Sequence, residues 1–444
     1  MRYLRIFVLC CVGLVALTSL ASGQVWKKRY DGSASKNDLG KTVAVDSAGN
    51  VYVAGTVWNG ASEDDYVVFK YNNSGNLLWK QLYDGKTHRD DYVNAMKVDS
   101  AGNVYVTGTS IGTGQDGDYL TVKYDTNGNF QWARTYNGSG NWDDSALAIA
   151  IDSVGNVYIT GASWGSVINY NYATLKYSPV GKQIWVRSNN GSADYHDFAN
   201  AIAVDNSGNV FVTGGSYGAA GSLDYLTIKY SPTGQRLWYK RYDGVQSGID
   251  YANAIVLDGA GNIYVTGASM GVDKNYDFVT LKYDTNGNSQ WGKRYDGTGK
   301  ADDTANAIAL DASGNVYVTG QSVGNNTKSD FTTLKYDSAG HIQWTKRYNG
   351  SASGDDIASA MTLDSAGNVY VAGSTTSVNG TDYRAIKYSP AGSVLWSARY
   401  NNSGVNKADA AQSIAVDASG NVFVTGTSWG GATSNDILTL KYTP

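Results

Sequence analysis

Sulfur chemistry is almost absent from this 444-residue sequence, whose two cysteines, Cys10 and Cys11, both lie near its start. If the segment around them is removed, as argued below, the remaining chain has no thiol. That excludes disulfide bonds, a cysteine nucleophile and thiolate metal sites. Glu63 is the only glutamate, so a glycosidase-type pair of catalytic carboxylates would have to consist of two aspartates.

Long apolar runs are equally scarce. The one long run covers residues 6–20, follows Arg2 and Arg5, and ends at the small residues Ala21-Ser22-Gly23. This pattern is typical of a secretory signal peptide. We expect residues 1–23 to be removed and residues 24–444 to be secreted or periplasmic, as part of a bacterial cell envelope. No later run reaches the ~20 apolar residues of a membrane-spanning helix, so no membrane span is expected.

Charge of either sign is modest. The formal net charge is -4, and removal of the two arginines near the start makes it more negative by two. A mildly acidic chain argues against a nucleic-acid partner. There are only 4 prolines but 53 glycines and 34 tyrosines, a composition that favours strands and turns over helices.

What the sequence has in abundance is repetition. The pattern of the stretch DDTANAIALDASGNVYVTG, Asp302 to Gly320, occurs eight times in the sequence, with a step of 53 residues from one copy to the next. In this repeat we expect four strands, a to d, at Asn306–Leu310, Asn315–Gly320, Asp330–Tyr336 and Ile342–Tyr348. A D-x-x-G-N turn joins a to b, a similar turn joins c to d, and longer polar loops join b to c and d to the next a.

The repeats predict an all-β, eight-bladed β-propeller of four-stranded antiparallel blades. Large and small apolar residues alternate along strand a, so we expect it to be buried on both faces. The chain begins with a lone d strand, Gln24–Tyr30, and ends with a lone c strand, Asp436–Tyr442. Joined, these strands complete the last blade, so the N-terminal strand closes the ring and removes open sheet edges. Residues 24–444 should therefore form a single domain, which we expect to be a monomer.

The repeat also resembles a known family. The segment GSASGDDIASAMTLDSAGNVYVAGSTTS, Gly350 to Ser377, and its seven counterparts are similar to the bacterial SBBP-type β-propeller repeat. The resemblance implies a propeller in an exported protein, and it implies no particular activity or catalytic residue. The family name implies seven blades, whereas eight repeats can be counted here.

Residues present in every repeat are more simply structural than catalytic. One aspartate series lies just ahead of strand a, and we expect it to accept backbone N–H groups from the loops. The alternative is a ring of carboxylates that binds cations such as calcium, in a protein otherwise expected to need no cofactor. This series is Asp38, Asp91, Asp144, Asp197, Asp250, Asp303, Asp356 and Asp409. The second series should form the a–b turns and comprises Asp46, Asp99, Asp152, Asp205, Asp258, Asp311, Asp364 and Asp417.

Residues that break the symmetry are better candidates for ligand binding. The b–c and d–a loops emerge on one face of a propeller, and variable loops on a rigid scaffold commonly bind ligands. Aromatic residues in these loops could stack on sugars or anchor a protein; alternatively, they pack over the tops of the blades. The candidates are Trp58, Trp164, Tyr217 and Trp429 at one repeated position, with Trp142 and Tyr170 in the third repeat.

The third repeat departs most from the others. Asn171 stands where most repeats have aspartate near the start of strand c, Asn189 replaces the last tyrosine of strand d, and Tyr195-His196 precede the fourth repeat. We therefore expect a unique site in the groove between repeats three and four. As an alternative function, Tyr195 or His196 would abstract a proton in a polysaccharide lyase. The three histidines, His88, His196 and His341, show no metal-binding spacing.

Three functions are consistent with these features. The first is an exported, non-enzymatic binding scaffold that takes an extracellular glycan or protein on its loop face. The second is a carbohydrate-active enzyme. The third is a purely structural component of the cell envelope.

Overall fold

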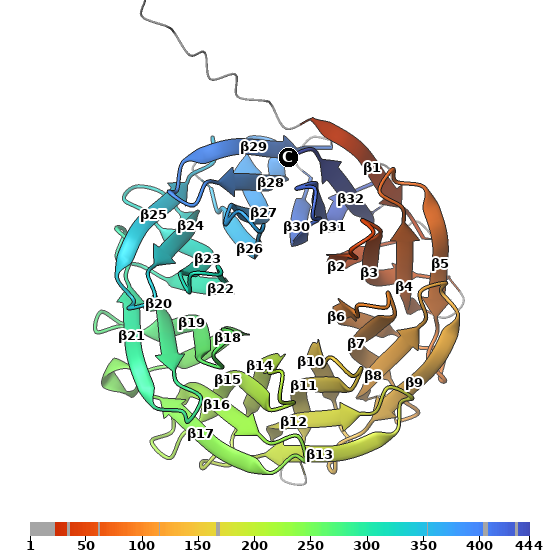
Figure 1. Ribbon diagram of the computed structural model, residues 1–444, viewed down its shortest axis with the longest axis horizontal. Helices are drawn as coiled ribbons and strands as arrows, with labels where there is room; N and C mark the ends of the chain where they lie inside the picture. Colours follow the sequence, from red (N-terminus) through yellow and green to blue (C-terminus); the bar gives the residue numbers. More distant parts are fainter. Residues whose placement is uncertain are drawn as a thin grey trace, which may run out of the picture.

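The computed structural model describes residues 23–32, 36–60, 63–114, 116–165, 169–352, 354–402, 407–430 and 434–444, and the expected signal peptide lies outside them except for Gly23. These residues form eight four-stranded antiparallel sheets arranged in a ring (Figure 1). The predicted eight-bladed β-propeller is therefore confirmed. Within the described residues, the single helical element is the 3-10 turn η1, Val245–Ser247, and no helix is both long and apolar enough to cross a bilayer.

Each blade runs outward from the central channel through strands a, b, c and d, and we number the blades 1 to 8 from β2. The innermost strands are β2 (Leu39–Val45), β6 (Asp91–Val98), β10 (Asp144–Ile151), β14 (Asp197–Val204), β18 (Asp250–Leu257), β22 (Asp303–Leu310), β26 (Ile357–Leu363) and β30 (Asp409–Val416). The second strands are β3 (Val51–Trp58), β7 (Val104–Ile111), β11 (Val157–Trp164), β15 (Val210–Tyr217), β19 (Ile263–Met270), β23 (Val316–Val323), β27 (Val369–Ser377) and β31 (Val422–Trp429).

The two outer strands follow in the same order. The third strands are β4 (Asp64–Tyr71), β8 (Gly117–Tyr124), β12 (Tyr170–Tyr177), β16 (Leu223–Tyr230), β20 (Tyr276–Tyr283), β24 (Ser329–Tyr336), β28 (Gly380–Tyr388) and β32 (Asn435–Tyr442). The outermost strands are β5 (Leu77–Tyr83), β9 (Phe130–Tyr136), β13 (Gln183–Asn189), β17 (Arg236–Tyr242), β21 (Ser289–Tyr295), β25 (Ile342–Tyr348), β29 (Val394–Tyr400) and, in blade 8, β1 (Gln24–Tyr30).

The first and last strands of the chain close the ring. Strand β1 pairs antiparallel with β32, with Trp26 opposite Lys441 and Tyr30 opposite Ile437. Figure 1 shows the two strands side by side, one at each end of the colour scale. Blade 8 is thus built from both ends of the chain, as the sequence predicts.

The a–b turns owe their shape to the second aspartate series. In blade 6, Asp311 accepts hydrogen bonds at Oδ1 from the N–H groups of Ser313 and Asn315, both at 2.9 Å. The hydroxyl of Tyr317 donates to Oδ2 at 3.0 Å, and Gly314 takes the positive φ that the turn requires. Burial acts to raise the pKa of Asp311, but the hydrogen bonds to the carboxylate outweigh it and leave that pKa below its usual value.

Neighbouring blades are joined through the c–d turns. The indole N–H of Trp132 and the ammonium of Lys123, both in blade 2, donate to the carbonyl of Pro179 in blade 3, at 3.1 and 2.9 Å. Lys123 also lies 5.0 Å from the centre of the Tyr105 ring. Six other blades have an equivalent tryptophan bond and an equivalent lysine bond. The repeated tryptophans and lysines therefore hold one blade to the next.

The innermost strands differ from expectation in their burial. Most residues of β22 are half-buried, because strand a lines the central channel and has no further strand inside it. A register shift at its bulged residue, Asn306, turns that amide toward blade 7, where Nδ2 donates to the carbonyl of Ala358 at 2.9 Å. Asn94, Asn200 and Asn253 make the same bond to the next blade. The innermost contacts between these blades are thus polar.

Candidate ligand-binding site on the loop face

The b–c and d–a loops meet at the aspartate that begins strand a. In blade 6, Oδ2 of Asp303 accepts the N–H of Gly297 at 2.5 Å, and Oδ1 accepts the N–H of Val323 at 2.9 Å. A d–a loop N–H donates to Oδ2 in all eight blades. Burial raises the pKa of Asp303 to about 6, even though these hydrogen bonds favour the carboxylate. The geometry gives this series a loop-fixing role.

The residue before this aspartate links each blade to the one before it. Asp302 accepts the N–H of Tyr276, the first residue of β20 in blade 5, at 2.9 Å. Asp90, Asp143, Asp355 and Asn37 make the same contact. The adjacent aspartates of the repeat therefore bind backbone groups of two different blades.

His196 occupies this linking position between blades 3 and 4. Its Nδ1 accepts the N–H of Tyr170 at 3.2 Å, so the proton of the neutral ring lies on Nε2. The ring of Tyr195 packs on Tyr217, with 5.4 Å between centres. The proton-abstraction alternative would thus have to use an imidazole whose Nδ1 already accepts a backbone hydrogen bond.

The structure brings several predicted residues of the third repeat together. We call Trp142, Trp164, Tyr170, His196 and Phe198 the aromatic cluster. The ring centre of Trp164 lies 4.8 Å from that of Tyr170, which it meets edge-on, and 6.0 Å from that of Trp142. His196 lies 5.4 Å from Tyr170, and Trp142 is 58% exposed. The cluster therefore joins loop residues of blades 3 and 4, and Trp142 is its exposed aromatic ring.

Trp58 and Trp429 do not join this cluster, and Tyr217 packs against Tyr195 instead. Trp58 and Trp429 are half-buried at the ends of their b strands. Each ring is covered by the ammonium of a d–a loop lysine, Lys36 at 3.7 Å and Lys407 at 3.8 Å from the ring centre. The repeated loop position thus forms separate small contacts in different blades, as the packing alternative expects for these two tryptophans.

Amide groups lie beside the aromatic cluster. Asn169 and Asn171 are buried, and within the described residues their Oδ1 atoms have no hydrogen-bond partner. The Nδ2 of Asn169 reaches Oδ1 of Asn190 at 3.4 Å. Asn171 and Asn190 occupy positions that hold carboxylates in blades 1, 4, 5 and 8, so the polar groups here are neutral where other junctions are acidic.

Phe198 and these amides were not among the predicted site residues. Phe198 follows the repeated Asp197 directly and resembles any apolar strand residue in sequence. The replacement of aspartate by Asn171 was visible, but its proximity to Asn169 and Asn190 depends on how strands β12 and β13 pair. In the sequence, these amides could therefore be noticed only as residues that depart from the repeat.

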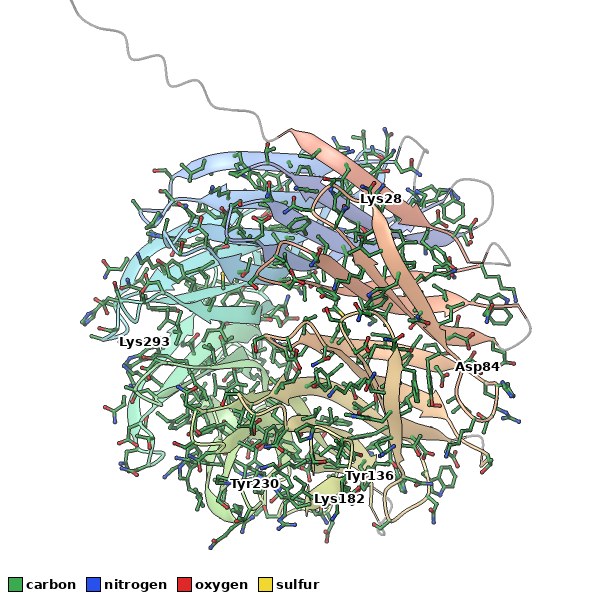
Figure 2. The ribbon with its side chains drawn as sticks, turned by 45° about the vertical axis from the view of Figure 1, so that its right-hand side comes forward. Lys28, Asp84, Tyr136, Lys182, Tyr230 and Lys293 are labelled. Carbon is green, nitrogen blue, oxygen red and sulfur yellow. The ribbon has the colours of Figure 1, made fainter. Side chains whose placement is uncertain are left out.

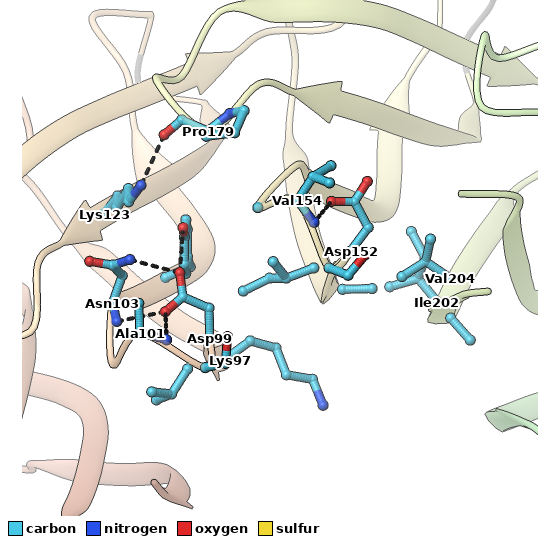
Figure 3. A pocket seen from close by; sticks show the side chains of 18 of the residues that line it. Lys97, Asp99, Ala101, Asn103, Lys123, Asp152, Val154, Pro179, Ile202 and Val204 are labelled. Atoms are coloured by element: carbon cyan, nitrogen blue, oxygen red, sulfur yellow. Dashed lines mark hydrogen bonds between the residues drawn. The ribbon is translucent and has the colours of Figure 1, made fainter. Parts of the chain in front are cut away.

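A second concave site lies in the central channel, at the hairpin end opposite the loops. The cavity, of about 860 Å³, is lined by the inner strands and turns of blades 2 to 5. Lys97 extends into it (Figure 3), at a position that holds alanine in blades 1, 3, 4, 6 and 8. Its side chain is in contact with solvent but surrounded by protein, and this desolvation lowers the pKa of Lys97. The sequence analysis did not predict this site.

Comparison with known proteins identifies the repeat. The family model described as a beta-propeller repeat, SBBP, matches eight segments of the chain. These are residues 27–59, 83–114, 131–169, 190–219, 239–271, 290–326, 343–380 and 396–431.

More distant likenesses add little detail. An uncharacterized WD repeat-containing protein of Acanthamoeba polyphaga mimivirus is 24% identical over 483 aligned positions, covering 88% of this chain and 33% of the relative. The chain thus spans about a third of that protein's length. A protein of unknown function from Bacteroides caccae is similar with a TM-score of 0.36, at 10% identity, over 58% of this chain and 81% of the other. A eukaryotic initiation factor is similar with a TM-score of 0.42, at 10% identity, over 83% and 79%.

Proposed function

The chain belongs to the family of SBBP beta-propeller repeat proteins, and on this premise we propose that it is a non-catalytic interaction scaffold that binds a glycan on its loop face. The aromatic cluster between blades 3 and 4 is the binding site. It is the observation that carries the proposal, because it is built from residues that the repeat does not require.

The chemistry of the cluster favours a sugar. Apolar C–H faces of a pyranose stack on exposed aromatic rings, here Trp142 and, beside the cluster, Tyr195, which is 59% exposed. Sugar hydroxyls also need neutral donors and acceptors, which the amides of Asn169 and Asn171 can supply. A buried amide oxygen without a partner is costly, and a hydroxyl placed nearby would satisfy it.

The N-terminal segment supports export as the second part of this proposal. The basic residues, apolar run and small-residue site in residues 1–23 form a secretory pattern, and an extracellular location would expose the loop face to glycans. Sequencing of the N-terminus of the protein recovered from culture medium and periplasm would test it. A start at Gln24 supports export, whereas a retained segment in the cytosol contradicts it.

A glycan-array screen of the folded protein, with and without calcium, tests the ligand. The same screen is made with Trp142→Ala and Tyr195→Ala combined, and with Tyr239→Ala as the control, an exposed aromatic residue on the outer strand β17. Binding that is lost in the double variant and kept in the control supports the site. Binding unaffected by the double variant overturns it.

Further assays on the same protein separate the three alternatives: a protein ligand, a lyase activity and a purely structural role. Absence of glycan binding together with capture of a specific protein favours a protein ligand, which the WD-repeat description of the viral relative also suggests. Formation of unsaturated sugar products that stops in His196→Ala would reveal a lyase. Absence of all three activities supports a purely structural component.

A further inference from the structure

Three polar positions recur in every repeat at the junction between two blades on the loop face. They are the second residue of strand c in most blades, the residue after strand d, and the aspartate that begins the next strand a. At four junctions all three are aspartates, whose carboxylate oxygens lie within 4.8 Å of one another. These triples are Asp65, Asp84 and Asp91; Asp224, Asp243 and Asp250; Asp277, Asp296 and Asp303; and Asp31, Asp38 and Asp436.

Three of the four triples include an arginine from strand d. Arg241 pairs with Asp224 at 2.9 Å and Arg294 with Asp277 at 2.6 Å. Arg29 pairs with Asp436 at 2.7 Å. These guanidinium groups offset the repulsion between the clustered carboxylates.

The triple between blades 1 and 2 differs, because Leu82 stands at the position of the arginine. Asp65 and Asp91 are both fully buried here. Asp84 directly follows strand β5 (Figure 2), and its Oδ2 meets Nδ1 of the exposed His88 at 2.6 Å. In place of a guanidinium, this triple has His88 at the solvent edge, whose imidazole pairs with Asp84.

Two oxygens of this triple also have no partner among the described residues, Oδ1 of Asp84 and Oδ1 of Asp91. In the seven other blades, Oδ1 of the equivalent aspartate accepts an N–H from the end of strand b. In blade 2 that N–H, from Ile111, donates instead to the carbonyl of Asp90 at 2.9 Å. Oδ1 of the fully buried Asp91 therefore lacks the backbone N–H that its counterparts accept, and the side chain of Ser110 is the polar group that interacts with this carboxylate.

We propose that Asp65, Asp84 and Asp91 bind a calcium ion that joins blade 1 to blade 2. Calcium binds oxygen ligands at about 2.3–2.6 Å, so oxygens on opposite sides of the ion lie about 4.8 Å apart. The triple satisfies that limit and supplies three negative charges for two positive ones. The ion takes the electrostatic role that the arginines have at the other three triples, and this site is independent of the proposed glycan site.

A proton is the competing occupant. Burial raises the pKa of Asp91 to about 7, so without a cation its carboxyl group retains much of its proton near neutral pH. The other titratable groups that interact with Asp91 are Asp65 and Tyr66 on β4, Tyr83 on β5, and Asp84 directly after β5.

Terbium luminescence and calorimetry on the folded protein test the proposal. Terbium substitutes for calcium, and its emission is excited through tyrosine; Tyr66 and Tyr83 adjoin two of the ligand residues. We expect sensitised emission that excess calcium abolishes, one calcium bound per chain, and a rise in melting temperature with calcium. Absence of emission, heat and thermal shift in the wild-type protein overturns the proposal.

Three variants locate the ion. Asp84→Asn places the residue that blades 2, 3, 6 and 7 have at this position, so it should fold and bind calcium at least tenfold more weakly. Leu82→Arg supplies the missing guanidinium and should abolish the response to calcium while raising the melting temperature in EGTA. Asp243→Asn, in a triple that has its arginine, should bind like the wild type. Unchanged binding in both Asp84→Asn and Leu82→Arg would overturn the site.

Discussion

The indole N–H of Trp26 donates to the carbonyl of Asn73 at 3.1 Å, which ties the first strand of the chain to the c–d turn of blade 1. Trp396 holds the same position in blade 7. It faces blade 8, where β32 and β1 are not joined by a turn, and its buried indole nitrogen has no acceptor among the described residues. Two tryptophans at the same repeat position thus differ by one hydrogen bond, because only one of them faces a c–d turn.

A comparison of Trp26 with Trp396 therefore measures how much this hydrogen bond contributes to the free energy of unfolding. Trp26→Phe removes the N–H and should lower the free energy of unfolding by about 1 kcal/mol more than Trp396→Phe does, since the second change removes no bond. Urea unfolding of both variants provides the comparison. Equal losses would show that the indole bonds do not stabilise the contacts between blades.

The adjacent aspartates of the repeat should differ in importance. Asp303→Ala leaves the N–H groups of Gly297 and Val323 without their acceptor in a buried site and should cost about 2–4 kcal/mol. Asp302→Ala removes one bond at the protein surface and should cost about 1 kcal/mol or less. Thermal and urea unfolding of the two variants would test the difference, which a catalytic pair would not predict.

Stability should depend on pH through the buried aspartates. Burial raises the pKa of Asp91 to about 7 and that of Asp38 to about 6, from 3.8. The folded state therefore holds protons that the unfolded state releases, so the free energy of unfolding should fall as pH rises from about 4 to about 7. The turn aspartates, such as Asp311, act in the opposite sense, because their lowered pKa makes stability decline as pH falls below about 4.

Urea unfolding between pH 3 and pH 8, with EGTA present to remove calcium, checks this profile. Asp91→Asn removes the residue with the most strongly raised pKa and should flatten the decline above pH 5. Stability that rises steadily from pH 4 to pH 7 would contradict the assignment.

Ligand affinity should depend on Trp142 without a matching effect on stability. Trp142→Ala removes a ring that is 58% exposed, so the melting temperature should change little. Affinity for a glycan found on the array should fall about tenfold or more, which corresponds to ~1.4 kcal/mol. Isothermal calorimetry measures this, with Tyr239→Ala as the control; an equal loss in both variants would mean that the cluster is not the site.

The fold was predictable from the sequence because each strand and turn of a blade occurs in eight copies of the repeat. The step between turn aspartates such as Asp258 and Asp311 gave the blade count, and the unmatched strands at Gln24 and Tyr442 gave the closure. The prediction that strand a is buried on both faces was wrong. Alternating large and small side chains do not distinguish a strand between two sheets from one that borders a channel.

The candidate site was predictable only in part. Trp142, Trp164 and Tyr170 departed from the repeat, so they could be singled out, and the structure places them together. The acidic triple could not be recognised as a cluster, because Asp65, Asp84 and Asp91 belong to three elements of two blades. Only the assembled junction shows that Leu82 leaves it without an arginine.

The closure of blade 8 also has a consequence for how the protein reaches its native state. Strand β1 is synthesised first, yet its partner β32 lies more than 400 residues later in the sequence. During synthesis the earliest strand therefore has an unsatisfied edge that other chains could pair with. Completion of the ring is an event of very high contact order, and we expect refolding to be limited by the docking of residues 24–30 and to aggregate more readily when they are deleted.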